Sequence, residues 1–254
     1  MRRGHTPGRS HAMPLPVAAL SFDGDDTLWD FGSGFAPAIE HAARLLSEAC
    51  GGRAVTVGQL HEVREEVARR MPGAGFGAIR RAALAESARR LGCERPGLAE
   101  EVYRSFVAVR AERTLLHPEA GEVLRRLAAV LPLALTTNGT TDLGPLGLDG
   151  VFTVVVRAAE CGVHKPDPGI YRVTAERLGV PPGQVLHVGD HPVEDVAAAR
   201  AAGMAAVLLD RSGRTPGALR SLDGLPALLT GPGPGSELRA GQAGQAGPAG
   251  PTAR

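Results

Sequence analysis

Three aspartates, Asp23, Asp25 and Asp26, stand within four residues directly after the apolar run 17–22. Repulsion between them and partial burial make such a cluster costly unless a cation neutralises it. If the chain continues extended, Asp23 and Asp25 point the same way, and Gly24 between them lets the backbone approach a ligand. Two acids on one face can divide nucleophilic attack and proton donation between them. Asp-Gly-Asp is also a common turn composition, so a solvated turn is the alternative for this segment taken alone.

Other apolar runs also end in groups that suit a phosphate or a cation. Thr137 and Asn138 close one run and supply a hydroxyl and turn amides, which suit phosphate oxygens, although Asn-Gly alone is usually a turn. Lys165 follows in a proline-fixed segment ahead of a helix, and Asp190 and Asp195 come after the next run. Lys165 is also the only lysine, so 27 of the 28 cationic side chains are arginines. A compact ammonium and a planar guanidinium are not interchangeable, which marks this position as one that needs the former.

The pattern between the two ends of the chain alternates strand-like and helix-like segments. Apolar runs at 17–22, 131–137, 151–156, 185–188 and 205–209 predict strands, and stretches at 118–129, 168–178 and 193–202 predict helices. Asp167 is the predicted N-cap of the second of these helices, which Gly179 ends. The alternation predicts an α/β fold with a parallel sheet covered on both faces, whose ligands bind beyond the carboxyl ends of the strands.

The interval 31–113 interrupts this alternation and predicts about four helices. One is opened by a capping box from Thr56 to Gln59, and another spans 77–91. We interpret the interval as a helical cap inserted after the first strand; an independent helical domain beside the sheet is the alternative. The predicted domains are therefore the α/β core, 15–30 and 114–230, and the cap, 31–113.

The composition, 43% hydrophobic and 22% charged, is that of a globular chain with a real core. A formal charge of +1 argues against nucleic acid as a partner, and no apolar stretch reaches the ~18 to 20 residues that a membrane span needs. Three scattered cysteines and an N-terminal stretch unlike a signal peptide favour a reducing cytoplasm. Residues 1–14 and the Gly-, Pro-, Ala- and Gln-rich residues 231–254 are predicted to be disordered extensions.

With its segments in this order, the chain resembles the haloacid dehalogenase (HAD) superfamily, specifically its phosphatase members with a helical cap after the first strand. The matching motifs are FDGDDTL, LTTNG, HKPDP and GDHPVED, and the resemblance spans about residues 15–210. It implies a Rossmann-like core with an inserted α-helical cap domain, and phosphoryl transfer through an aspartyl-phosphate. By this resemblance Asp23 attacks phosphorus, and Asp25 protonates the leaving oxygen and later deprotonates the hydrolytic water.

A phosphoryl transition state mainly needs positioning and charge neutralisation. A hard divalent cation is therefore expected between the carboxylates, and Mg²⁺ is the natural choice. The family pattern implies that the Asp23 carboxylate, the Asp25 main-chain carbonyl and the Asp190 carboxylate hold it. Asp195 reaches the cation through water or orients Lys165.

The phosphoryl oxygens are expected to bind Thr137, Asn138 and Lys165, and Thr27 is expected to steady Asp25. Other residues in or beside the motifs are expected to have structural roles. Asp26 is predicted to be a turn or helix-cap acid, Trp29 to pack at the hinge of the cap, Thr136 to be buried opposite Thr137, and His164, His187 and His191 to be packing or surface histidines.

The function that these residues favour is a Mg²⁺-dependent phosphatase acting on a small phosphorylated metabolite. A haloacid dehalogenase would also use Asp23 as nucleophile, but its pattern lacks the second acid at Asp25 and needs no metal. A phosphotransferase differs mainly in how well the closed cap excludes water. A non-catalytic binding protein on this fold is the alternative from another class. The sequence leaves monomer or homodimer open.

Substrate contacts are the least defined part of the sequence. The loop 71–77 lies between cap helices and is positioned to drape over the site, with Arg80 or Arg81 offering a guanidinium to an anionic substrate. Because the chain is rich in arginine, the alternative is that Arg80 and Arg81 are an ordinary solvated pair on a helix without a role in substrate binding.

Overall fold

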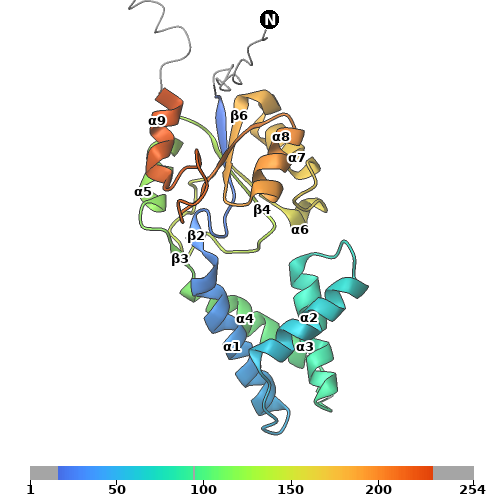
Figure 1. The fold of residues 1–254 in the computed structure, drawn as a ribbon. Helices are drawn as coiled ribbons and strands as arrows, with labels where there is room; N and C mark the ends of the chain where they lie inside the picture. Colours follow the sequence, from blue (N-terminus) through green and yellow to red (C-terminus); the bar gives the residue numbers. More distant parts are fainter. Residues whose placement is uncertain (1–16, 94, 231–254) are drawn as a thin grey trace, which may run out of the picture.

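The computed structural model describes residues 17–93 and 95–230. The predicted disordered extensions, 1–14 and 231–254, lie outside the described residues. The described chain consists of a sheet with helices on both faces and a group of four helices beyond one end of that sheet (Figure 1). The predicted α/β fold class is confirmed. No helix in these residues is long and apolar enough to cross a membrane.

The central sheet has five parallel strands in the order β5-β4-β1-β6-β7. The strands are β1 (Ala19–Phe22), β4 (Leu133–Thr137), β5 (Val154–Arg157), β6 (Val185–Gly189) and β7 (Ala205–Leu208). Each strand begins inside the apolar run that predicted it, and its last residue lies within one position of the end of that run. In the middle strand, Leu20 pairs with Leu133 of β4 and Leu186 of β6. The carboxyl ends of these three strands therefore meet at one edge.

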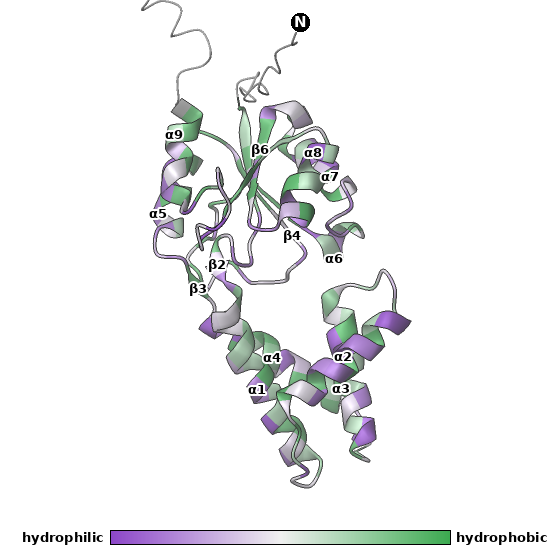
Figure 2. Cartoon of the chain, viewed as in Figure 1, coloured by the Kyte–Doolittle hydropathy of each residue, from purple (hydrophilic) through white to green (hydrophobic). Residues whose placement is uncertain are grey.

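Alternate side chains of β1 belong to two different cores, as a pleated strand requires. Leu20 and Phe22 pack with α5 (Ala120–Ala128) and α9 (Leu225–Thr230). Ala19 packs on the opposite face with α7 (Gly169–Leu178) and α8 (Ala198–Ala201). Figure 2 shows the strands as mostly hydrophobic, which is expected of a sheet covered on both faces.

Shorter helical segments connect these elements: α6 (Ala158–Cys161), the 3₁₀ turns η1 (Pro182–Gln184) and η3 (Leu222–Gly224), and the π-helix η2 (Pro192–Ala197). The helix predicted over 193–202 is therefore η2 followed by α8. The predicted N-cap Asp167 is one residue early, because Pro168 occupies that place; the Asp167 carboxylate instead accepts a hydrogen bond of 2.7 Å from the Gly169 amide. Gly179 ends α7 in the left-handed conformation, as predicted.

The predicted helical interval contains α1 (Phe31–Ala49), α2 (Val57–Arg70), α3 (Phe76–Arg90) and α4 (Leu98–Arg113). The capping box is present: Thr56 Oγ1 accepts from the Gln59 amide at 3.1 Å, and Gln59 Oε1 accepts from the Thr56 amide at 2.9 Å. These helices share a buried core of their own, separate from the cores of the sheet, that includes Ile39, Leu84 and Phe106.

The chain enters and leaves the four helices through two adjacent short strands. β2 (Trp29–Asp30) and β3 (Leu115–Leu116) are antiparallel, and Trp29 pairs with Leu116. Asp26 lies in the turn after β1, one of its two predicted roles, and its Oδ1 accepts a hydrogen bond of 3.0 Å from the first amide of α1. The N-cap of α1 is Asp30, whose Oδ1 accepts from the Gly32 amide at 2.8 Å. Trp29 is buried at this hinge, as predicted.

Candidate active site

Lys165 is the centre of a buried charge cluster at the carboxyl edge of the sheet. Its Nζ lies 2.6 Å from Asp23 Oδ1 and 2.7 Å from Asp195 Oδ1. The Lys165 side chain is 2% exposed. The lysine that composition singled out therefore meets the first aspartate of the first motif, although 142 positions separate the two in the chain.

Asn138 holds Lys165 through its side chain. Its Oδ1 accepts from the Lys165 amide at 2.9 Å, and its Nδ2 donates to the Lys165 carbonyl at 3.1 Å. Nδ2 also donates to Glu194 Oε2 at 3.3 Å. The Asn138 side chain is therefore engaged by the loop that carries Lys165, and it positions the ammonium. Binding of phosphate by the main-chain amides of this turn stays a prediction.

Asp195 reaches the cluster from η2, and local π-helical geometry is often found at functional sites. Its Oδ2 accepts from the His191 amide at 2.9 Å, and its Oδ1 lies 3.4 Å from His187 Nε2. Burial lowers the pKa of His187, so this fully buried imidazole is neutral at pH 7. His187 is thus a packing residue, as predicted, and it also fixes the orientation of Asp195.

Asp190, at the end of β6, completes the carboxylate cluster. Oxygens of Asp23, Asp190 and Asp195 all lie within 4.8 Å of one another. Thr27 Oγ1 donates to Asp190 Oδ1 at 3.2 Å. The prediction that Thr27 steadies Asp25 is therefore wrong: the turn after β1 directs this hydroxyl toward the neighbouring strand β6.

The charges of this cluster do not balance, because Lys165 is a single cation among three carboxylates. Burial, opposed by Lys165, raises the pKa of Asp23 to about 8. Burial, together with repulsion from Asp195, raises the pKa of Asp190 to about 6. Converging oxygen ligands that lack a counter-charge suit a hard divalent cation. The residues present therefore fit the metal site that the sequence predicts.

Asp25 lies at the border between the core and the four helices. Its Oδ1 accepts from Trp29 Nε1 at 2.7 Å, and both of its oxygens accept from one guanidinium nitrogen of Arg110 in α4, at 3.0 and 3.2 Å. The same nitrogen donates to Thr141 Oγ1 at 3.2 Å. Arg110 is a site residue that the sequence did not indicate.

Thr137 and Asp25 approach each other across Gly139. A Cβ at Gly139 would lie 3.0 Å from Asp25 Oδ2 and 3.2 Å from Thr137 Oγ1. The Thr137 hydroxyl accepts from the Gly139 amide at 2.9 Å, and its own proton has no acceptor among the described residues. Its position suits a donor to an anion held near Asp25. Thr136 is buried on the other face, as predicted.

Gly24 lies against the ring of Trp29, a constraint that the sequence did not indicate. A Cβ at this position would lie 2.3 and 2.6 Å from two atoms of the Trp29 ring. The glycine therefore makes room for the indole that holds Asp25.

Gly24→Ala is expected to lower the free energy of unfolding by about 1–3 kcal/mol, because the indole must shift. Urea denaturation measures this. Gly58→Ala is the matched control, since a Cβ there meets only Thr56 Oγ1 at 3.8 Å and helix α2 favours alanine. Equal midpoints for the two variants would contradict the assignment.

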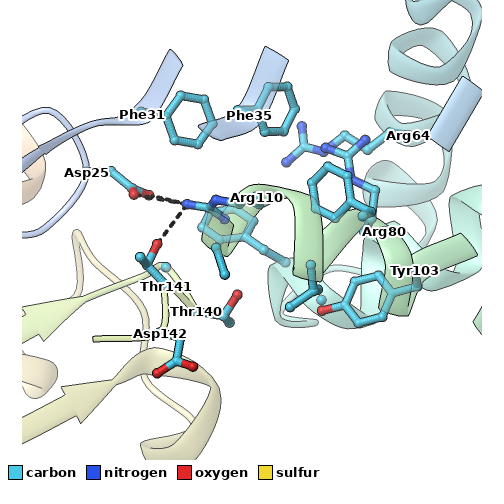
Figure 3. A pocket seen from close by; sticks show the side chains of 16 residues that line it. Asp25, Phe31, Phe35, Arg64, Arg80, Tyr103, Arg110, Thr140, Thr141 and Asp142 are labelled. Atoms are coloured by element: carbon cyan, nitrogen blue, oxygen red, sulfur yellow. Dashed lines mark hydrogen bonds and ion pairs between the residues drawn. The ribbon is translucent and has the colours of Figure 1, made fainter. Parts of the chain in front are cut away.

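A cavity of about 230 Å³ opens between the four helices and the core, next to Asp25 (Figure 3). Its lining includes Asp25, Gly139 and Thr141 from the core, and Phe31, Phe35, Phe76, Arg64, Arg80, Tyr103, Phe106 and Arg110 from the helices. Phe76, at the end of the predicted draping loop, lies 6.4 Å from the ring of His164, so this loop reaches the core beside Lys165.

The structure separates the two predicted substrate arginines. Arg80 lines the cavity. Arg81 is outside that lining: its side chain is 47% exposed, lies over the ring of Tyr103 at 4.2 Å, and pairs with Glu100 at 3.1 Å. The predicted contact with substrate is therefore kept for Arg80, and for Arg81 the alternative of an ordinary surface arginine holds.

Comparison with known proteins identifies the family. The family model of haloacid dehalogenase-like hydrolases matches residues 17–203. The chain belongs to this family. This haloacid dehalogenase-like hydrolase is 31% identical over 209 residues to the phosphoglycolate phosphatase of Escherichia coli K12, a match that covers 75% of this chain and 80% of that protein.

Two further comparisons place this hydrolase among its relatives. It is 40% identical over 124 residues to the phosphoserine phosphatase of Thermus thermophilus, but the match covers only 46% of this chain and 49% of that protein, about half of its length. The solved structure of a 2-haloacid dehalogenase from Pseudomonas syringae pv. tomato is similar with a TM-score of 0.72 and 31% identity, covering 84% of this chain and 98% of that one.

Proposed function

We propose that the protein is a Mg²⁺-dependent phosphatase that hydrolyses a small phosphorylated metabolite through an aspartyl-phosphate on Asp23. The observation that carries the proposal is the contact of Lys165 Nζ with Asp23 at 2.6 Å, inside a cluster completed by Asp190 and Asp195. The phosphoserine and phosphoglycolate phosphatases among the relatives support it. The three free cysteines suit a reducing cytoplasm.

In the first step, an Asp23 carboxylate oxygen forms a bond to phosphorus while the bond from phosphorus to the ester oxygen breaks. The leaving oxygen takes a proton from Asp25. Lys165 balances the charge that gathers between Asp23 and the phosphoryl group, and the Thr137 hydroxyl donates to a phosphoryl oxygen.

In the second step, a water oxygen attacks phosphorus, the bond from phosphorus to Asp23 breaks, and Asp25 takes the proton of the water. Both proton transfers need a free Asp25 oxygen, and Arg110 and Trp29 donate to these oxygens in the structure. Substrate binding therefore has to displace Arg110 from Asp25.

Mg²⁺ is the proposed cofactor, and the carboxylates of Asp23 and Asp190 and the main-chain carbonyl of Asp25 would hold it, with Asp195 beside them in the same cluster. When bound, it neutralises negative charge on the carboxylates and on the transferring phosphoryl group. Asp195 contacts Lys165 directly, so it orients the ammonium as well as contributing to the cluster.

A dehalogenase is the second candidate, and the similarity to the Pseudomonas syringae enzyme favours it. Two features support the phosphatase over it: the second acid, Asp25, which the dehalogenase pattern lacks, and the carboxylate cluster that fits a cation. A phosphotransferase would share these features and differ in the acceptor, so transfer to an added alcohol distinguishes it.

Release of phosphate from p-nitrophenyl phosphate tests the proposed function. With Mg²⁺ we expect turnover, and EDTA should reduce it at least ~100-fold, since metal ions contribute several kcal/mol to such transition states. Added Mg²⁺ should restore the rate. Release of chloride from 2-chloropropionate is the parallel assay: chloride release without phosphate release, or a phosphate release that EDTA leaves unchanged, would contradict the proposal.

A further inference from the structure

The cavity of about 230 Å³ has Asp25 at one end of its lining and extends from there between the four helices (Figure 3). Asp23 and Lys165, the residues proposed to hold the phosphoryl group, are not part of its lining. Asp25 is the residue proposed to protonate the ester oxygen. The part of a substrate that lies beyond the ester oxygen must therefore occupy this cavity.

Three arginines line the cavity, and one of them lacks a counter-charge. Arg110 pairs with Asp25, and Arg64 pairs with Glu65. Arg80 makes no ion pair or hydrogen bond with any residue in 17–93 or 95–230. Burial, together with repulsion from Arg64 and Arg110, lowers the pKa of Arg80 to about 10, which still leaves it charged at pH 7. Arg80 is thus the arginine of this lining without an ion partner among the described residues, and the remaining acid of the lining, Asp142, is exposed and accepts a hydrogen bond from the Gly144 amide.

Aromatic rings hold this guanidinium in place. Its central carbon lies 5.3 Å from the ring centroid of Phe35 and 5.4 Å from that of Phe106, within the range of cation–π contacts. The other aromatic residues of the lining are Phe31, Phe76 and Tyr103. Such a wall favours an apolar ligand body, and it strengthens a charge-assisted hydrogen bond to Arg80 because little water competes.

The size of the cavity limits that body. A cavity of about 150 Å³ is enough to bind benzene in a protein core. A space of about 230 Å³ therefore accepts one ring-sized group with a small substituent. The planar guanidinium of Arg80, which holds no carboxylate in the structure, matches the two oxygens of one planar carboxylate.

We propose that the substrate is a phosphomonoester whose leaving group is a single ring-sized apolar body bearing a carboxylate, and that Arg80 binds this carboxylate. The proposal rests on the proposed phosphatase function and names the substrate class of the same site.

Two aryl phosphates of the same shape test the inference: 4-carboxyphenyl phosphate and the uncharged 4-carbamoylphenyl phosphate. The ratio of their kcat/KM values, with Mg²⁺, is the readout. A hydrogen bond to a charged group contributes ~1.5–3 kcal/mol, so the wild type should favour the carboxylate by about 10- to 100-fold. Arg80→Gln should bring the ratio close to one, and Arg80→Lys should retain part of it. Arg81→Gln, the neighbouring control, should keep the wild-type ratio.

The outcomes separate the two proposals. Phosphate release from both esters with a wild-type ratio near one, or a ratio that Arg80→Gln leaves unchanged, overturns the carboxylate inference while the phosphatase stands. If neither ester nor p-nitrophenyl phosphate releases phosphate, the phosphatase proposal fails and this inference fails with it. The wild-type ratio needs no variant, so a poorly folding Arg80→Gln protein leaves the test intact.

Discussion

Asp23→Asn is expected to reduce phosphate release from p-nitrophenyl phosphate by at least ~10⁴-fold at saturating Mg²⁺, because removal of a covalent nucleophile leaves only binding and charge stabilisation. An asparagine keeps the size of the side chain and an oxygen that accepts from Lys165 Nζ, so the hydrogen bond of 2.6 Å has a substitute. Steady-state turnover, measured together with the urea midpoint in EDTA, separates loss of chemistry from loss of folding.

Stability is expected to change little, or to rise, in this variant. The pKa of Asp23 is raised to about 8 in the folded protein, above its ordinary value of 3.8. Because the pKa is higher in the folded protein than in the unfolded chain, the carboxyl group contributes its full stability below pH 3.8. This contribution is lost as the pH rises through the folded-state pKa of about 8. At pH 7 without a cation, folding must therefore protonate a carboxyl group that is ionised in the unfolded chain, or bury its charge, and an asparagine avoids this cost.

Asp26→Asn is the matched control, since it makes the same chemical change three positions along the chain. Asp26 Oδ1 accepts from the Phe31 amide at 3.0 Å, and an asparagine oxygen can replace it. This variant should keep wild-type turnover. If it loses as much activity as Asp23→Asn, the two positions are equivalent and Asp23 is not the nucleophile.

Lys165→Met is expected to lower the free energy of unfolding by about 3–5 kcal/mol, because it leaves Asp23 and Asp195 buried beside each other without their shared cation. Turnover should be lost as well. Urea denaturation in EDTA measures the first effect, and the phosphate assay measures the second.

The double variant Lys165→Met with Asp195→Asn tests the cause of this loss. It removes one of the two stranded carboxylates, so it should regain part of the stability that the single variant loses. Lys165→Arg should keep more stability than Lys165→Met but not the turnover, since a planar guanidinium cannot take the position of a compact ammonium. A Lys165→Met protein with the wild-type urea midpoint would refute the description of Lys165 as the buried counter-charge.

The position of Asp23, Thr137 and Asp190 at one edge of the sheet could be predicted from the sequence, because each lies at the end of a strand of one parallel sheet. Parallel strands place their carboxyl ends at one edge, and β4 and β6 flank β1. Lys165 could be predicted as well, because it is the only lysine in the chain.

Side-chain partners within the site were harder to predict than the positions of the residues. Arg110 is one of 27 arginines, and nothing in its neighbours marks it; only its place one turn before the chain leaves α4 brings it to Asp25. Thr27 belongs to the first motif, yet it donates to Asp190, because the turn decides which way a short side chain points. Asn138 likewise belongs to a motif that suits phosphate, and its side-chain amide is hydrogen-bonded to the main chain of Lys165, in a loop distant in sequence.

The pairing of β2 with β3 brings the two ends of the helical insertion together, with Asp30 opposite Leu115 and Trp29 opposite Leu116. The helical insertion therefore starts and ends at neighbouring antiparallel strands, as the loop of a β-hairpin does. Loop-closure entropy changes only slowly with the length of such a tip. Changes in length or sequence within these helices therefore leave Asp23 and Asp190 where β1 and β6 place them, and Arg110 is the residue through which α4 still acts on Asp25.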